Sequence, residues 1–144
     1  MSDGGAGNLS ASIEQLMRAF PDAIDNAVKS TALTVQNHAR VSIQREQSAG
    51  VVYQRGNITH QASAPGDAPN TDTGALVSSI VAEYPRKGVA FVGTSKAYGE
   101  YLEFGTRNMA ARPWLRPAKA QGQQQLPKAI TNAINKEIQR VSKK

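Results

Sequence analysis

The sequence predicts an α+β fold in which two longer amphipathic helices pack against a small antiparallel β-sheet. Two long segments, one near each end of the chain, repeat apolar residues at helical spacing. Between them, two short runs of β-branched and aromatic residues flank a Pro-Arg-Lys-Gly turn, as in a β-hairpin. A polar segment rich in Gly, Pro, Ser and Asn predicts an extended loop or arm.

The chain has 144 residues, which is enough for one domain with a modest core. Hydrophobic residues make up 40% of the chain and aromatic residues 6%, so we expect a thin, aliphatic core. Neighbouring subunits would then supply part of the stability. Residues 1–9 are Gly-rich and predict a disordered N-terminus, whereas residues 10–144 predict a single α+β domain.

The first long helix is predicted from Ser10 to about Arg45. We expect Pro21 either to break this helix or to open a new one. Residues 46–72 then predict a long loop or a loose hairpin arm, because so long a polar stretch has little to bury. The apolar stripe of the helix consists of Ile13, Leu16, Met17, Phe20, Ile24, Val28 and Val35.

Capping signals delimit the elements of the second half of the chain. Thr71 or Asp72 is a candidate N-cap, and Gly105 is suited to the left-handed residue that ends a helix. The predicted elements are a short helix in residues 73–80, a hairpin of residues 81–84 and 89–93, a short helix in residues 95–104, and a last amphipathic helix in residues 117–142.

The formal net charge of +6 is unevenly distributed along the chain. Residues 106–144 hold nine Lys or Arg and one acid, whereas residues 1–105 hold eight basic and ten acidic residues. This asymmetry indicates either an acidic partner, whether nucleic acid or protein, or a solvated face that keeps the protein soluble. No apolar run approaches the ~20 residues needed to span a bilayer, so we expect no membrane partner.

The sequence offers no convincing catalytic apparatus. The letters DTGA at residues 72–75 also occur in retroviral-type aspartic proteases, where the Asp follows a buried apolar strand. Here polar and Pro-rich residues precede it, and a helix cap explains the same letters. Glu100 and Glu103 lie one helical turn apart, a common arrangement on an exposed helix. With no cysteine and two widely separated histidines, we expect no catalytic residues, no metal site and no cofactor.

The segment ARPWLRPA places the only Trp of the chain between Pro113 and Pro117. Prolines hold the backbone extended, so that little entropy is lost when such a segment binds in a groove. Trp and Arg are also enriched among interface hot spots. Trp114 and Leu115 therefore either pack on their own core at the start of the last helix or anchor a neighbouring subunit, and the two roles are compatible.

Three motifs follow one another within residues 12–140. They are Thr73, Gly74 and Leu76; then Tyr98, Glu103, Gly105 and Thr106; then Pro113, Trp114, Leu115, Pro117 and Ala118. In this order and spacing the chain resembles the small neck or tail-completion proteins of tailed bacteriophages, the gene-product-ten-like family of HK-type lambdoid phages. Gly99 stands where Ala is commoner in that family, which should slightly weaken the helix.

The resemblance implies a structural virion protein rather than an enzyme: a ring-forming head–tail joining or tail-completion protein of the phage neck. It would be found in the virion and, during assembly, in the host cytoplasm. Its partners would be copies of itself in a ring of six or twelve, adjoining neck and tail-terminator or head-completion proteins, and packaged DNA, contacted non-specifically in the lumen. The alternative is a basic nucleic-acid-binding accessory protein that contacts phosphates.

The resemblance also implies where the interface lies. Glu103 is expected to pair with an Arg, such as Arg107 or Arg112, within or between subunits, and Gly105 is expected to turn the chain. The predicted subunit or partner interface consists of Tyr98, Tyr101, Glu103, Phe104, Gly105, Thr106, Arg112, Pro113, Trp114 and Leu115. The side chains predicted to face DNA or an acidic partner are Arg107, Arg112, Arg116 and Lys119.

Overall fold

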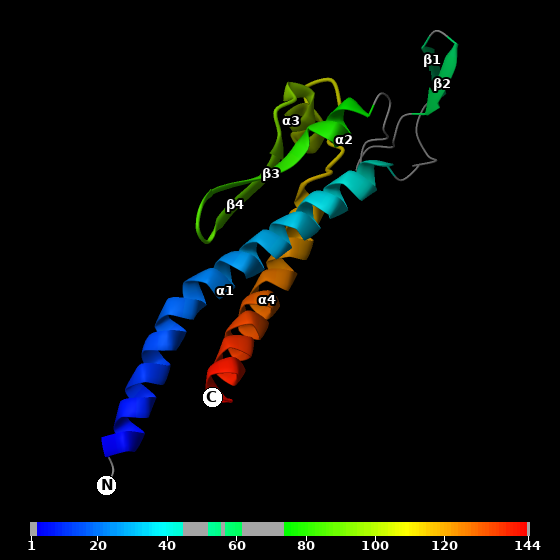
Figure 1. The fold of residues 1–144 in the computed structure, drawn as a ribbon. Coiled ribbons are helices and arrows are strands. Elements are labelled where there is room, and N and C mark those ends of the chain that lie inside the picture. Colours follow the sequence, from blue (N-terminus) through cyan, green and yellow to red (C-terminus); the bar gives the residue numbers. More distant parts are fainter. Residues whose placement is uncertain (1–2, 45–51, 56, 62–73, 144) are drawn as a thin grey trace.

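The computed structural model describes residues 3–44, 52–55, 57–61 and 74–143, and it confirms the α+β fold (Figure 1). Two long helices run side by side, and an antiparallel strand pair packs against them. The elements in chain order are α1 (Asp3–Gln44), β1 (Val52–Arg55), β2 (Ile58–Gln61), α2 (Ala75–Ser79), β3 (Ile80–Arg86), β4 (Val89–Thr94), α3 (Ala97–Phe104) and α4 (Arg116–Ser142).

The helices α1 and α4 are antiparallel and form the long axis of the molecule (Figure 1). Their backbones approach closely at Gly122, where an added Cβ would lie 2.5 Å from Cγ2 of Val35. Nearby, the side-chain amide of Gln125 donates a hydrogen bond to Oγ1 of Thr34, at 3.2 Å. These contacts place the first half of α4 against the second half of α1.

The helix α1 differs from the sequence prediction in two ways. It begins at Asp3, within the segment predicted to be disordered, and it continues through Pro21. Proline removes one backbone donor and bends a helix, and α1 is indeed curved (Figure 1). The side chains of Phe20 and Ile24, on either side of Pro21, are half-buried, and α1 packs along α4.

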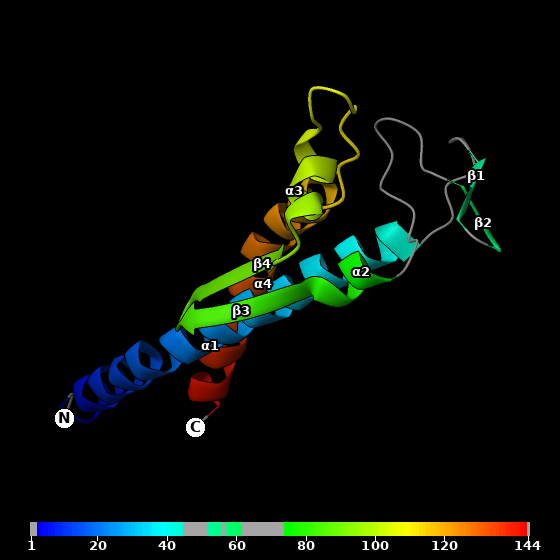
Figure 2. The ribbon, with the colours of Figure 1, turned by 90° about the horizontal axis from the view of Figure 1, so that it is seen from above.

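The strands β3 and β4 form the predicted hairpin, which lies along α1 (Figure 2). Their register pairs Ile80 with Thr94 and Glu83 with Phe91. At the start of β3, the carbonyl oxygen of Ile80 accepts hydrogen bonds from the side chains of Gln36 (3.0 Å) and Arg40 (2.6 Å) of α1. The hairpin is therefore tied to α1 at its base.

The turn of the hairpin is also tied to α1. The backbone N–H of Gly88 donates to the Asp25 carboxylate at 2.8 Å, and Lys87 forms an ion pair with Asp22. Lys29 lies one helical turn from Asp25 and approaches its other oxygen to 3.0 Å. Both ends of the β3–β4 hairpin are thus fixed on α1.

The buried core lies near the C-terminal end of α1. It is small and mostly aliphatic, as the composition predicts, with one large aromatic ring at its centre. Val35, Val92, Leu102 and Leu115 pack against it and are partly buried. Its buried residues are Ala39, Ile43, Leu76, Val77, Ile80, Trp114 and Ala118.

The segment before β3 contains a strand pair and a short helix. In the described part of residues 46–72, β1 and β2 pair in an antiparallel hairpin of their own, in agreement with the loose hairpin arm. The helix α2 begins at Ala75, after Gly74, whose φ is 76°. The predicted caps Thr71 and Asp72 lie outside the described residues.

Candidate subunit interface around Trp114

The helix α3 ends at Gly105, as predicted. Its φ of 76° is disfavoured for residues with a side chain, and a Cβ there would lie 2.9 Å from the backbone of both Met109 and Ala111. The N–H of Gly105 donates to the carbonyl of Tyr101 at 2.8 Å, which closes the helix. The tight turn that follows is held by paired backbone hydrogen bonds between Thr106 and Met109, at 2.8 and 3.3 Å.

The buried carboxylate of Glu103 joins α3 to the first turn of α4. One of its oxygens accepts the backbone N–H groups of Trp114 and Leu115, both at 2.8 Å. The other accepts the N–H of Arg116 at 2.9 Å and lies 3.5 Å from Nε of Arg116. Helix N-termini leave such donors unsatisfied, and a negative charge there also interacts favourably with the helix dipole. Glu103 therefore caps α4 from a different helix.

The expected partners of Glu103, Arg107 and Arg112, are not the ones observed. Arg107 is exposed, and the backbone N–H of Arg112 donates instead to the carbonyl of Leu102, at 2.6 Å. The sequence prediction considered only side-chain partners close to the turn. The backbone N–H groups beyond Pro113 were not predicted as partners, because their distance from Glu103 depends on how the loop returns to α3.

Trp114 packs inside its own chain, the first of the two alternatives. It is 2% exposed, and its indole N–H donates to the carbonyl of Gly99 at 2.9 Å. A Cβ on Gly99 would lie 2.5 Å from Cγ2 of Thr94 and 3.4 Å from Cζ2 of Trp114. Gly99 therefore has a packing role, because the helix can approach the indole and β4 only without a side chain at this position.

The outer surface of α3 carries the aromatic side chains of the predicted interface. Tyr98, Tyr101 and Phe104 recur every third residue, and Tyr101 and Phe104 are 54% and 66% exposed. The guanidinium of Arg116 lies 5.4 Å from the centre of the Phe104 ring, a cation–π distance. We call the exposed side chains of Tyr98, Tyr101 and Phe104 the aromatic face of α3.

A groove of about 770 Å³ lies beside this face, where β4, α3 and the start of α4 meet. Charged side chains of both signs line it: Lys96, Glu100, Glu103, Arg116 and Lys119. The floor includes Trp114 and Leu115, which is half-buried against the core. Of the remaining predicted residues, Thr106 is exposed at the turn, and Arg112 and Pro113 are half-buried in the loop.

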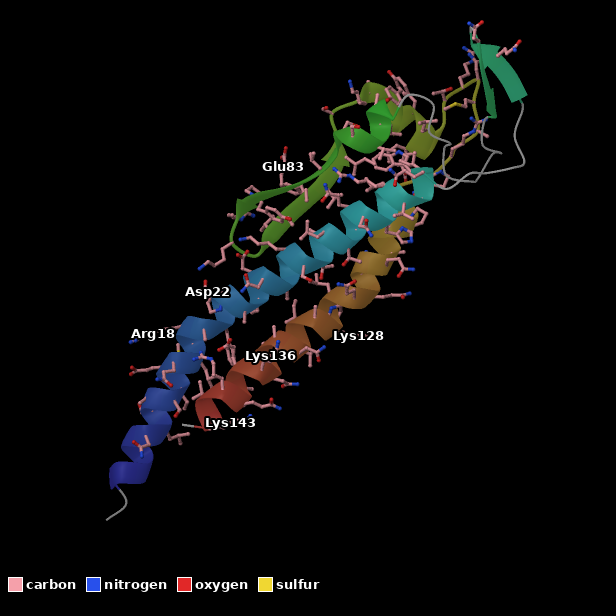
Figure 3. The ribbon with its side chains drawn as sticks, turned by 45° about the vertical axis from the view of Figure 1, so that its right-hand side comes forward. Arg18, Asp22, Glu83, Lys128, Lys136 and Lys143 are labelled. Carbon is pink, nitrogen blue, oxygen red and sulfur yellow. The ribbon has the colours of Figure 1, made fainter. Side chains whose placement is uncertain are left out.

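The basic residues of the last quarter continue along α4. Beyond Lys119, exposed lysines follow at Lys128, Lys136 and Lys143, spaced along the helix (Figure 3). The one acid of α4, Glu137, is paired with Arg140 at 2.6 Å. These lysines are not among the residues predicted to face DNA or an acidic partner, although the charge count of the last quarter includes them.

The hairpin also carries an apolar surface that was not predicted from the sequence. Val81 and Phe91 lie in the part of β3 and β4 that faces away from the core, and Phe91 is 61% exposed. The signal is present in the sequence, because successive residues of a strand that covers a core on one side only should alternate between apolar and polar. The run VAFV in residues 89–92 does not alternate, which indicates a strand with apolar residues on both faces.

The described residues contain no group of three or more His, Asp or Glu side chains placed to hold a metal ion. Within the same ranges, no helix combines the length and apolarity that a bilayer crossing needs. No protein-family model, curated protein or solved structure matches the chain.

Proposed function

We propose that this chain is a structural protein of the tailed-phage neck, a ring-forming head–tail joining or tail-completion protein around the DNA channel. Support comes from the order of the three motifs and, above all, from the aromatic face of α3. That face is apolar, exposed and held on a well-fixed support, which are properties of residues that anchor protein interfaces.

The aromatic face is held in place by the contacts between α3 and the first turn of α4. Glu103 and Trp114 fix α3 to the first turn of α4 through four hydrogen bonds to backbone groups. A surface that is already ordered before binding loses little entropy when a partner covers it. The aromatic face is therefore suited to repeated contacts between subunits or with an adjoining ring.

The test is whether the protein forms rings through this face. We expect native mass measurement and electron microscopy of the assembled protein to show rings of six or twelve copies. The double variant Tyr101→Asp, Phe104→Asp should remain folded but fail both to assemble and to restore neck formation in a complementation assay. The matched control is Leu33→Asp, an exposed apolar residue of α1 elsewhere on the surface.

Folding and assembly can be separated in these variants. Trp114 is the only indole of the chain and is buried, so its fluorescence reports the folded state. A double variant that keeps the native emission and still completes functional necks would refute the interface role of α3. A wild-type protein that forms no ring, alone or with neck partners, would refute the proposed function.

The second candidate is a basic nucleic-acid-binding accessory protein, and the exposed lysines of α4 favour it. Contacts with phosphates weaken steeply with salt, by a slope of about 0.9 per phosphate on logarithmic axes. Replacing Lys128, Lys136 and Lys143 by Gln should then lower both the affinity for duplex DNA and that slope. A monomer that binds DNA in this way and never forms rings would favour this candidate over the neck protein.

A further inference from the structure

The strand β4 has one free edge. In the described residues, β4 pairs with β3 along one side, and no third strand pairs with it along the other. Another strand can add to such an edge, and natural proteins usually protect their edges with lysine, proline or a β-bulge. The strand β3 has this protection, in Pro85 and in the irregular register between Glu83 and Arg86. The strand β4, with the sequence VAFVGT, contains no proline and no charged residue.

There is open space beside the free edge of β4. A hollow of about 320 Å³ lies where α1, β4 and α4 meet. Ala90 and Val92 of β4 line it, together with Leu115 and Leu126, and no described residue of β3 does. The groove beside α3 shares Leu115 with this hollow and is bordered by Gly93, near the end of β4. The free edge of β4 therefore runs along two neighbouring depressions over α4.

The β1–β2 hairpin lacks a surface to pack on. It lies beyond the C-terminal end of α1, and in the described part of the chain no helix or other strand packs along it (Figures 1 and 2). Two antiparallel strands alone are marginally stable in water at best, whereas three or more strands over an apolar surface are stable. Its sequence contains Val52, Tyr53 and Ile58, residue types that favour strands. Joining a larger sheet would therefore stabilise this hairpin.

We infer that the β1–β2 hairpin of one copy of this chain adds to the free edge of β4 in a second copy. Backbone hydrogen bonds would hold the added strand, and every second side chain would point toward the helices beneath. The product is a four-stranded sheet over α1 and α4 that covers the hollow between them. The inference rests on the proposed function for the ring, and it names one contact between neighbouring subunits.

A second copy is the occupant because each chain carries both halves of this contact. The hairpin and the free edge are different surfaces, and they lie apart on one subunit (Figures 1 and 2). A contact between two different surfaces of identical chains is head-to-tail, so each copy offers its hairpin to one neighbour and its edge to the other. Such contacts continue from copy to copy and form a ring when the rotation closes.

The first test follows backbone hydrogen exchange in the intact chain as its concentration is raised. The unpaired N–H groups of β4 exchange readily in a monomer and are protected once a strand pairs with them. We expect residues 89–94 and 52–61 to exchange at least about 10-fold more slowly in the assembled protein. No slowing at either segment overturns the inference. Slowing that is independent of concentration would place the hairpin on its own β4 and overturn the choice of a second copy.

The second test separates the two halves of the contact. In one variant, a Gly-Ser-Gly linker replaces residues 52–61, which removes the hairpin and keeps the edge. In the other, Phe91→Lys puts a charge on β4 at a side chain that is 61% exposed, which protects the edge and keeps the hairpin. We expect light scattering to show monomers for each variant alone and 1:1 pairs for the mixture. A mixture that stays monomeric overturns the inference.

The matched control is Val81→Lys. Val81 is 44% exposed on the same outer surface of the β3–β4 hairpin, but it belongs to β3. This variant should assemble as the wild type does, and a loss equal to that of Phe91→Lys overturns the role of the β4 edge. The fluorescence of the buried Trp114 checks that all three variants are folded.

Failure of this inference and failure of the proposed function are distinguishable. Rings that still form without the hairpin and with Phe91→Lys refute the strand addition and leave the neck protein standing. Mixed pairs from a chain whose wild type forms filaments but no ring support the strand addition and refute the neck protein. Protection of β4 that requires an added neck protein, and not a second copy, overturns the choice of occupant.

Discussion

The carboxylate of Glu103 acts as an N-cap for a helix to which it does not belong. Caps are usually supplied by Ser, Thr, Asp or Asn at the residue before a helix, but the residue at this position of α4 is Leu115, whose side chain cannot accept a hydrogen bond. Proline at the second position of α4 has no N–H group and so needs no acceptor, and Glu103 accepts the three N–H groups that precede it.

Glu103→Gln should lower the free energy of unfolding by about 2 kcal/mol. The amide has one acceptor oxygen, and its NH₂ group would face backbone N–H donors, so at least one charge-assisted hydrogen bond is lost. Urea unfolding followed by Trp114 fluorescence measures the change. The control is Glu100→Gln on the same helix, which is exposed and should cost less than about 0.5 kcal/mol. Equal losses in the two variants would contradict the capping role.

Gly99→Ala should destabilise the protein, although alanine favours helices by about 1 kcal/mol over glycine. The added methyl group would meet Thr94 at 2.5 Å and Leu76 at 3.2 Å, and such overpacking costs about 1–3 kcal/mol. Thermal unfolding measures the net loss. The control is Gly7→Ala in α1, where no atom lies within 4 Å of the added Cβ and no loss is expected. A stabilised Gly99→Ala variant would show that the Thr94 side chain moves aside to make room for the added methyl group.

At the scale of elements, the β3–β4 hairpin depends on charged contacts at its turn. The N–H of Gly88 is the largest cause that lowers the pKa of Asp25 below 3.8, and Lys29 adds to it. Asp22 raises the pKa of Lys87 above 10.5. A carboxylate with a lowered pKa stabilises the fold above the unfolded value and loses that contribution as the pH falls through the folded value.

We therefore expect the hairpin to loosen from α1 in acid. The midpoint of thermal unfolding, Tm, should fall as the pH drops below about 3.8, and Asp25→Asn should weaken that dependence while lowering Tm at neutral pH. Calorimetry at pH 7 and near pH 3 measures both effects. Glu14→Gln, which changes an exposed acid of α1 away from the hairpin, is the control. The same pH dependence in Asp25→Asn and in wild type would contradict this account.

Several elements could be predicted from the sequence because their signals are local. The apolar period predicts the end of α1 and the whole of α4 to within a residue or two, and Gly105 predicts the end of α3. Pro21 predicted a break, but α1 continues through it. The free-energy cost of a proline inside a helix can be read from the sequence. The contacts of a long helix with other elements cannot.

The candidate site was less predictable, since its central contacts join distant parts of the chain. The motifs draw attention to residues 98–118, but which of those residues are buried depends on the loop after Gly105. Trp114 turns inward and Tyr101 outward, and both are aromatic residues near a helix end. The hollow between α1, β4 and α4 could not be predicted at all, because its lining comes from three elements.

At the scale of the whole molecule, the two long helices differ in length. At 1.5 Å per residue, the 42 residues of α1 span about 63 Å and the 27 of α4 about 40 Å. The N-terminal turns of α1 consequently extend past the end of α4 (Figures 1 and 2). Leu9, Ile13 and Met17 lie at helical spacing in the N-terminal part of α1, and all three are exposed, Met17 to 68%.

These turns add little to the stability of one subunit. We expect deletion of residues 2–14 to shift Tm by less than about 4 °C, equivalent to about 1 kcal/mol in a chain of this size. For comparison, Ile43→Ala should cost about 2–5 kcal/mol, since Ile43 is fully buried in the core. Circular dichroism measures both. A deletion that destabilises as much as Ile43→Ala would show that the exposed apolar residues pack within the subunit.

The capping of α4 by Glu103 also has a mechanical consequence. Because the cap joins α3 to the first turn of α4, a force on α3 is transmitted directly to α4. The helix α4 in turn packs along α1, so its position is supported over much of its length. A protein that docks on α3 would therefore load both long helices and not the short helix alone.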